Sequence, residues 1–83
     1  MKYEAGEAYV WNLQFIPKRH LVIIKELGAE SVTYDEYFYP EMIQPKGWNG
    51  QRVSISMMDG LMGSLKGELV SVETTELLKE LWL

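Results

Sequence analysis

The sequence predicts a mainly β fold with a short C-terminal helix, arranged as a small antiparallel barrel or as a strongly bent five-stranded sheet. Five short stretches have the composition or the alternation of strands, and glycine, proline or Asn-Gly signals separate them. Segment 75–83 carries apolar side chains at helical spacing. Because the chain has 83 residues, we expect one domain, 1–83.

Segment 19–39 is expected to form the centre of the fold. It contains Leu21-Val22-Ile23-Ile24, the only run of four aliphatic residues in the chain, and β-branched side chains suit a buried strand. A second β-rich run, 31–34, follows. Gly28 between the runs predicts a hairpin with a type II′ turn and with Ile23 opposite Tyr34. That register buries one face and leaves the other half covered, and the buried face carries Leu21, Ile23, Leu27, Val32 and Tyr34.

Three further strands are expected, at 7–15, 52–57 and 68–72. The first two alternate with a period of two, and Pro17 ends the first because proline donates no ladder hydrogen bond. The inward side chains of the first strand are Tyr9, Trp11, Leu13 and Phe15, and those of the second are Val53, Ile55 and Met57. Asp59-Gly60 predicts a turn after the second strand, and 61–67 is expected to be a loose connection.

The expected helix, 75–83, carries Leu77, Leu78, Leu81 and Trp82 on one face. A helix of this length is not stable alone, so we expect it to dock on the sheet, with a partner helix as the alternative. This order of elements is compatible with an SH3-like barrel, with an OB-like sheet and with an open sheet that has a helix on one face.

The residues that most enzymes need are missing. The chain has no cysteine and a single histidine, His20, so the common pairs of nucleophile and base cannot be assembled. No phosphate-binding, dinucleotide-binding or zinc-protease motif occurs. Asp35 and Glu36 are adjacent on a predicted strand and therefore point to opposite faces. We expect no enzyme, no cofactor and no metal site. Without a signal peptide or a membrane span, a cytoplasmic location is expected.

Segment 34–41 is the candidate functional site, because four aromatic side chains and three carboxylates fall within it. With a net charge of −4, nucleic acid is an unlikely partner. We expect a small acidic, non-enzymatic protein-binding module, such as an accessory or inhibitory protein of a phage or mobile element. Its partner would have a basic or proline-containing surface, since arginine both pairs with carboxylates and stacks on rings. The predicted contact residues are Asp35, Glu36, Tyr37, Tyr39, Glu41 and Trp48.

Several alternatives remain open at this point. Segment 34–41 could be a solvated strand end, and if its tyrosines belong to the core, the site is expected beside Lys18, Arg19 and His20. Trp48 either plugs the end of a barrel or faces a partner. The chain could instead mimic a nucleic acid, or bind one through a small barrel. The nucleic-acid-binding residues would then be Lys18, Arg19, Lys46 and Arg52, with Trp11 or Trp48 for stacking.

Overall fold

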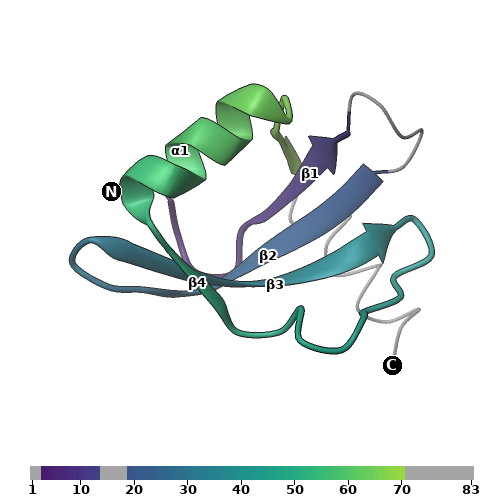
Figure 1. Ribbon diagram of the computed structural model, residues 1–83, viewed down its shortest axis with the longest axis horizontal. Coiled ribbons are helices and arrows are strands. Elements are labelled where there is room, and N and C mark those ends of the chain that lie inside the picture. The colour runs from purple at the N-terminus through teal and green to yellow at the C-terminus, as the bar shows by residue number, and fades with distance from the viewer. Residues whose placement is uncertain (1–2, 14–18, 71–83) are drawn as a thin grey trace.

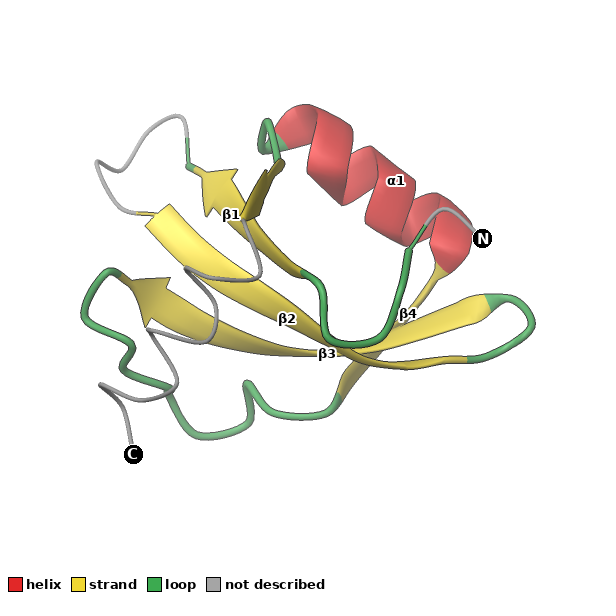
Figure 2. Cartoon of the chain, turned by 180° about the vertical axis from the view of Figure 1, so that it is seen from behind, coloured by secondary structure: helices red, strands yellow, loops and turns green. Residues whose placement is uncertain are grey.

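The structure of the protein is a computed structural model, and residues 3–13 and 19–70 are described. Its elements in chain order are β1 (Ala8–Asn12), β2 (Arg19–Leu27), β3 (Ser31–Tyr39), β4 (Gln51–Ser54), α1 (Ile55–Ser64) and β5 (Glu68–Val70). The strands form one antiparallel sheet in the order β4-β3-β2-β1-β5, and α1 lies across one face of it (Figures 1 and 2). The mainly β prediction is confirmed. The sheet is not closed, so the SH3-like barrel is not confirmed.

The β2–β3 hairpin is the centre of the sheet, as predicted, but its register differs. Ile24, not Ile23, lies opposite Tyr34, and a β-bulge interrupts the pairing at Lys25. Gly28 has no positive φ, and its N–H donates to the carbonyl of Ser31 at 2.9 Å, so the predicted type II′ turn is wrong. Because side chains alternate between faces, a shift of one residue exchanges the two faces of β2.

Both faces of the sheet are buried, whereas the sequence predicted one half-covered face. The cluster on the helix side contains Tyr3, Trp11, Val22, Ile24, Val32, Tyr34 and Met58. The cluster on the opposite side contains Ala8, Val10, Leu21, Ile23, Tyr37 and Met42. The four aliphatic residues 21–24 therefore supply both clusters in alternation, which explains why this part of the sequence is apolar without interruption.

Helix α1 occupies a segment for which the sequence predicted the end of a strand, a turn and a loop. The strand ends at Ser54, whose hydroxyl accepts the N–H of Met57 at 3.1 Å and caps the helix. Side chains at helical spacing then face the sheet, and Met58 is completely buried among them. The phenol of Tyr3 donates to Asp59 and ties the N-terminal segment to the helix. Among the described residues, no helix is long and apolar enough to cross a bilayer.

The helix expected at 75–83 lies outside the described residues, and its docking on the sheet stays a prediction. Phe15, the last inward residue predicted for the first strand, also lies outside them. Trp11 is buried, as predicted, and Tyr9 is half-buried. Val10 and Ala8 on the other face of β1 are buried too, so this strand also serves both clusters.

Replacing either of two glycines of this region with alanine is expected to change stability, in opposite directions for the two positions. A Cβ added at Gly60 meets no atom within 4 Å, so Gly60→Ala should stabilise the helix by about 0.5–1 kcal/mol. A Cβ at Gly67 would collide with the sulfur of Met62, which accepts the indole N–H of Trp11 at 3.2 Å. Gly67→Ala should therefore lower stability by about 1 kcal/mol. The urea midpoints of the two variants check both expected changes in stability. A lower midpoint for Gly60→Ala than for the original protein would contradict the presence of helix α1 at this position.

Candidate functional site

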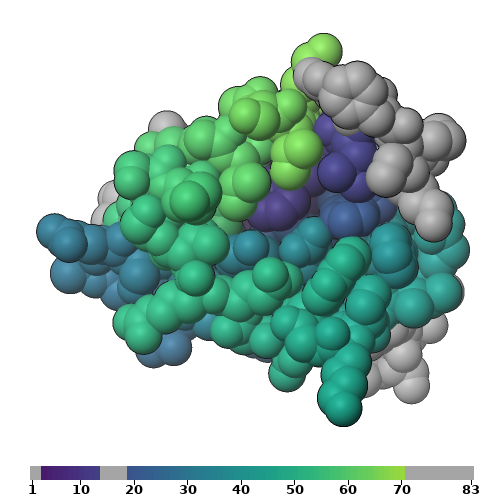
Figure 3. Space-filling view, in the orientation of Figure 1, coloured from purple at the N-terminus to yellow at the C-terminus, as the bar shows by residue number. Residues whose placement is uncertain are grey.

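Residues 40–50, which we call the edge loop, cover the part of β3 that β4 does not reach. Pairing between the two strands stops at Tyr34 and Gln51. Beyond that point, the N–H of Glu36 donates to the carbonyl of Trp48 and the N–H of Phe38 to the carbonyl of Ile43, both at 2.8 Å. The loop thus runs along the strand on the surface of the molecule, where it is coloured teal (Figures 1 and 3). It satisfies backbone groups that a bare strand edge would expose.

Two carboxylates of β3 hold the edge loop and its flanks from opposite faces of the sheet. One oxygen of Asp35 accepts the N–H of Gly50 at 2.8 Å, and the other lies 3.4 Å from the Lys25 ammonium. One oxygen of Glu36 accepts the side-chain amide of Gln51 at 3.0 Å. Each carboxylate residue is only 9% exposed. Asp35 and Glu36 were expected to meet a partner from an exposed strip, and that expected exposure is wrong: their oxygens are engaged within the chain.

The second oxygen of Glu36 binds His20, which the sequence indicated as functional only in the alternative site beside Lys18 and Arg19. It lies 2.5 Å from Nδ1 of His20, and the imidazole is 13% exposed. The imidazole packs against the rings of Phe38 and Trp48, at centroid distances of 5.3 and 4.9 Å. Trp48 is half-buried by this packing, so at least part of its ring serves to hold the loop. A buried polar side chain needs a partner, but only the true strand register identifies Glu36 as that partner.

The two tyrosines predicted for the site, Tyr37 and Tyr39, lie on the face of the sheet opposite to Glu36 and Phe38. Tyr37 is 6% exposed and belongs to the cluster around Leu21 and Met42, so its expected exposure is also wrong. Burial, with a smaller contribution from Asp35, raises the pKa of Tyr37, which keeps the phenol protonated. Tyr39 at the end of β3 is half-buried. The guanidinium carbon of Arg19 lies 5.1 Å from the centre of its ring.

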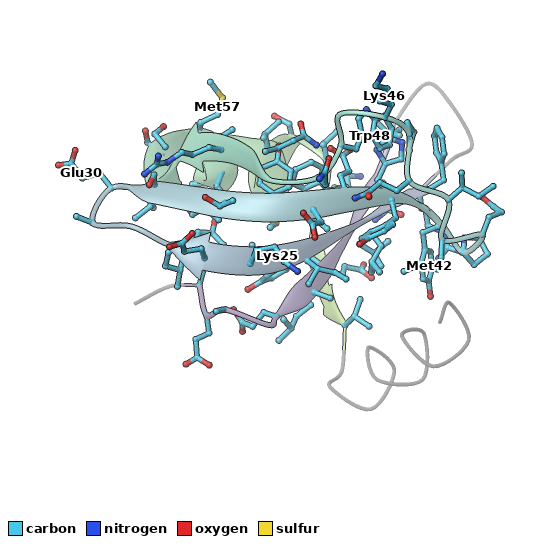
Figure 4. All side chains as sticks on the ribbon, turned by 90° about the horizontal axis from the view of Figure 1, so that it is seen from below. Lys25, Glu30, Met42, Lys46, Trp48 and Met57 are labelled. Atoms are coloured by element: carbon cyan, nitrogen blue, oxygen red, sulfur yellow. The ribbon has the colours of Figure 1, made fainter. Side chains whose placement is uncertain are left out.

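The edge loop buries the side chain of Met42 and exposes the next one, Ile43. Met42 is 6% exposed and has a φ of 59°, a left-handed conformation that costs a non-glycine residue about 1–2 kcal/mol. Its N–H donates to the carbonyl of Phe38 at 2.7 Å, and Figure 4 shows its side chain on the opposite side of the sheet from Trp48. The next side chain, Ile43, is 59% exposed. Glu41 and Lys46 of the same loop are also exposed. The anchoring of Met42 therefore fixes where Ile43 points.

The described structure offers no metal site and little support for base stacking. Within residues 3–13 and 19–70, no three carboxylate or histidine side chains are grouped so that they could hold a metal ion. Trp11 is 3% exposed, so it cannot stack on a nucleobase. Of the cations considered for nucleic-acid binding, Lys18 lies outside the described residues. Arg52 is exposed on β4, where its Nε lies 3.4 Å from the hydroxyl of Ser31.

The structure thus separates the predicted site residues into two groups. Asp35, Glu36 and Tyr37 are buried, whereas Tyr39 and Trp48 are half-buried on opposite faces of the sheet and Glu41 is exposed. Ile43 is the exposed aliphatic side chain of the edge loop, and sequence reasoning missed it. Comparison with family models, curated proteins and solved structures finds no match for the chain.

Proposed function

We propose that the chain is a non-enzymatic protein-binding module that uses the edge loop, centred on Ile43, as its contact surface. The observation that carries this proposal is the 59% exposure of an aliphatic side chain on a loop that β3 fixes through hydrogen bonds at both ends. Glu41 and Trp48 of the same loop, and Tyr39 at its start, are the predicted contact residues that keep some exposure. Asp35, Glu36 and Tyr37 would then act indirectly, by holding the loop in place.

Preorganisation is the physical reason why this loop suits binding. A loop that is already ordered loses little conformational freedom when a partner docks, so more of the contact energy becomes affinity. The edge loop is held by the carbonyls of Ile43 and Trp48 and by the N–H of Gly50. An accessory or inhibitory role in a phage or mobile element remains part of this proposal. A basic or proline-containing partner also stays a prediction. The expectation of such a partner relied on free carboxylates at Asp35 and Glu36, which are engaged within the chain.

Capture experiments with two matched variants test the proposal. Ile43→Ser removes the exposed aliphatic side chain of the edge loop, and Leu69→Ser removes one that is 61% exposed on β5, at the opposite edge of the sheet. Both variants should melt close to the original protein, because exposed substitutions usually change stability by less than about 0.5 kcal/mol.

The immobilised variants are then exposed to a lysate of the source organism, and the captured proteins are quantified by mass spectrometry. A protein that the original chain and Leu69→Ser retain, and that Ile43→Ser loses, supports the edge loop as the contact surface. If Ile43→Ser captures every protein that the original chain captures, the proposal is wrong.

A further inference from the structure

The edge loop contains an Asn-Gly pair, Asn49-Gly50, whose chemistry the proposed function does not use. Both residues are exposed, and a Cβ added at Gly50 would meet no atom within 4 Å. Because glycine has no side chain that could obstruct its backbone nitrogen, this nitrogen can reach Cγ of the preceding asparagine. Asn49 is therefore a candidate for deamidation, a modification that needs no reagent except water.

Deamidation begins when the Gly50 nitrogen attacks Cγ of Asn49. The nitrogen gives its proton to solvent, the side-chain amide leaves as ammonia, and a succinimide ring joins the two residues. Water then opens this ring at either of its carbonyl groups, which yields aspartate or isoaspartate. Both products add one negative charge to a chain whose net charge is −4, and isoaspartate also adds one methylene to the main chain.

Asp35 engages the nitrogen on which this reaction depends. One oxygen of its carboxylate accepts the N–H of Gly50 at 2.8 Å. Such a charge-assisted hydrogen bond stabilises the N–H form of the amide. The negative charge of Asp35 also disfavours the amide anion that attacks Cγ. Because the surroundings of Gly50 are open, this hydrogen bond is the contact that can slow the reaction, and it requires that the edge loop lies on β3.

The main chain on both sides of Asn49 is anchored to β3. Before Asn49, the carbonyl of Trp48 accepts the N–H of Glu36 at 2.8 Å, and after it the N–H of Gly50 donates to Asp35. Asp35 and Glu36 are neighbours on β3, so the two anchors cannot move apart. An additional methylene between the anchors therefore has to break at least one of them.

We propose that Asn49 is a deamidation site that Asp35 protects while the edge loop lies on β3, and that conversion of Asn49 to isoaspartate releases the loop. The modification then acts as an irreversible switch on the loop that carries Ile43. Its test requires no binding partner, so this inference and the proposed function can fail separately.

The rate of deamidation tests the protection by Asp35. Trypsin cleaves after Lys46 and Arg52, so peptide 47–52 carries Asn49, and mass spectrometry follows its modification in protein kept at mildly alkaline pH. Asn49 should deamidate about tenfold more slowly in the folded chain than in synthetic peptide 47–52. Asp35→Ala should remove this protection. Asp35→Asn, which keeps an oxygen acceptor without the charge, should give an intermediate rate.

Two control variants retain Asp35. Lys25→Gln removes the other contact of the carboxylate, whose atoms are 3.4 Å apart, and should deamidate as slowly as the original chain. Ile24→Ala weakens the core and should deamidate nearly as slowly. Equal rates in the folded chain and the free peptide, an unchanged rate in Asp35→Ala, or an equal rise in Ile24→Ala would mean that Asp35 does not protect Asn49, and would overturn the inference.

Hydrogen exchange of the two anchoring N–H groups, those of Glu36 and Gly50, tests the release of the loop. In the isoaspartate form, purified by chromatography, at least one of them should exchange about tenfold faster than in the original chain, because its hydrogen bond is broken. Asn49→Asp is the control, because it adds the same charge to an ordinary main chain, and both groups should exchange slowly in it. If both also exchange slowly in the isoaspartate form, the modification does not release the loop and the switch is refuted.

Discussion

Replacing Ile24 with alanine is expected to lower the free energy of unfolding by about 3–4 kcal/mol. Ile24 is 1% exposed at the middle of β2, where it packs in the cluster with Tyr34 and Met58. Removing three carbon atoms there loses apolar burial and leaves a cavity that the sheet and α1 cannot close without moving. A domain of this size has only about 5–8 kcal/mol of stability, so the variant should keep about 1–5 kcal/mol at room temperature. Urea unfolding followed by circular dichroism measures the loss.

Ile43→Ala is the matched control, because it removes the same atoms from a side chain that is 59% exposed. It should change the free energy of unfolding by no more than about 0.5 kcal/mol. If the two variants unfold at the same urea concentration, Ile24 does not lie in the core and the position of α1 over β2 is wrong.

The hairpin illustrates what local sequence can predict. The aliphatic run 21–24 and the β-rich run 31–34 were sufficient to place two strands and the turn between them. The register was missed, because it depends on a bulge at Lys25 that no turn residue announces. Gly28 suggested a turn that requires a positive φ, but in the structure Ala29 and Glu30 occupy the central positions without it.

Helix α1 was missed because two patterns overlap in its sequence. Val53, Ile55 and Met57 alternate as in a strand, whereas Met58, Leu61, Met62 and Leu65 recur at helical spacing. Gly60 and Gly63 weigh against a helix by propensity, and burial of Met58 against the sheet outweighs them. Ser54, which caps the helix, was the local signal that could have identified its start.

The candidate site was predictable in composition but not in geometry. Aromatic and acidic residues are concentrated in 34–41, and Trp48 packs against Phe38 of this segment, while its role as a contact surface stays a prediction. The partners of Glu36 come from β2 and β4, so its burial follows from the sheet order and not from neighbours in sequence. Ile43 had no distinguishing pattern, because its exposure results from the anchoring of Met42 beside it.

Glu36→Ala is expected to lower the free energy of unfolding by about 2–3 kcal/mol. The change removes the partner of His20 Nδ1, at a place where the imidazole is 13% exposed, and leaves the Gln51 amide only the more distant carbonyl of Trp48, at 3.5 Å. Glu26→Ala on the same hairpin is the control, because Glu26 is exposed, and it should cost no more than about 0.5 kcal/mol. Urea unfolding of both variants gives the comparison.

A double-mutant cycle then shows whether His20 and Glu36 act as a unit. His20→Phe keeps a ring against Phe38 and Trp48, but it leaves one oxygen of the carboxylate without its partner, at a cost of about 2 kcal/mol. In the double variant with Glu36→Leu, neither the imidazole nor a carboxylate is left unpaired, and the Gln51 amide loses its acceptor just as it does in the single Glu36→Leu variant. Its cost should therefore be smaller than the sum of the single His20→Phe and Glu36→Leu costs by at least about 1 kcal/mol. Strictly additive costs would mean that the two side chains are not coupled, and that backbone hydrogen bonds and Asp35 alone hold the edge loop on β3.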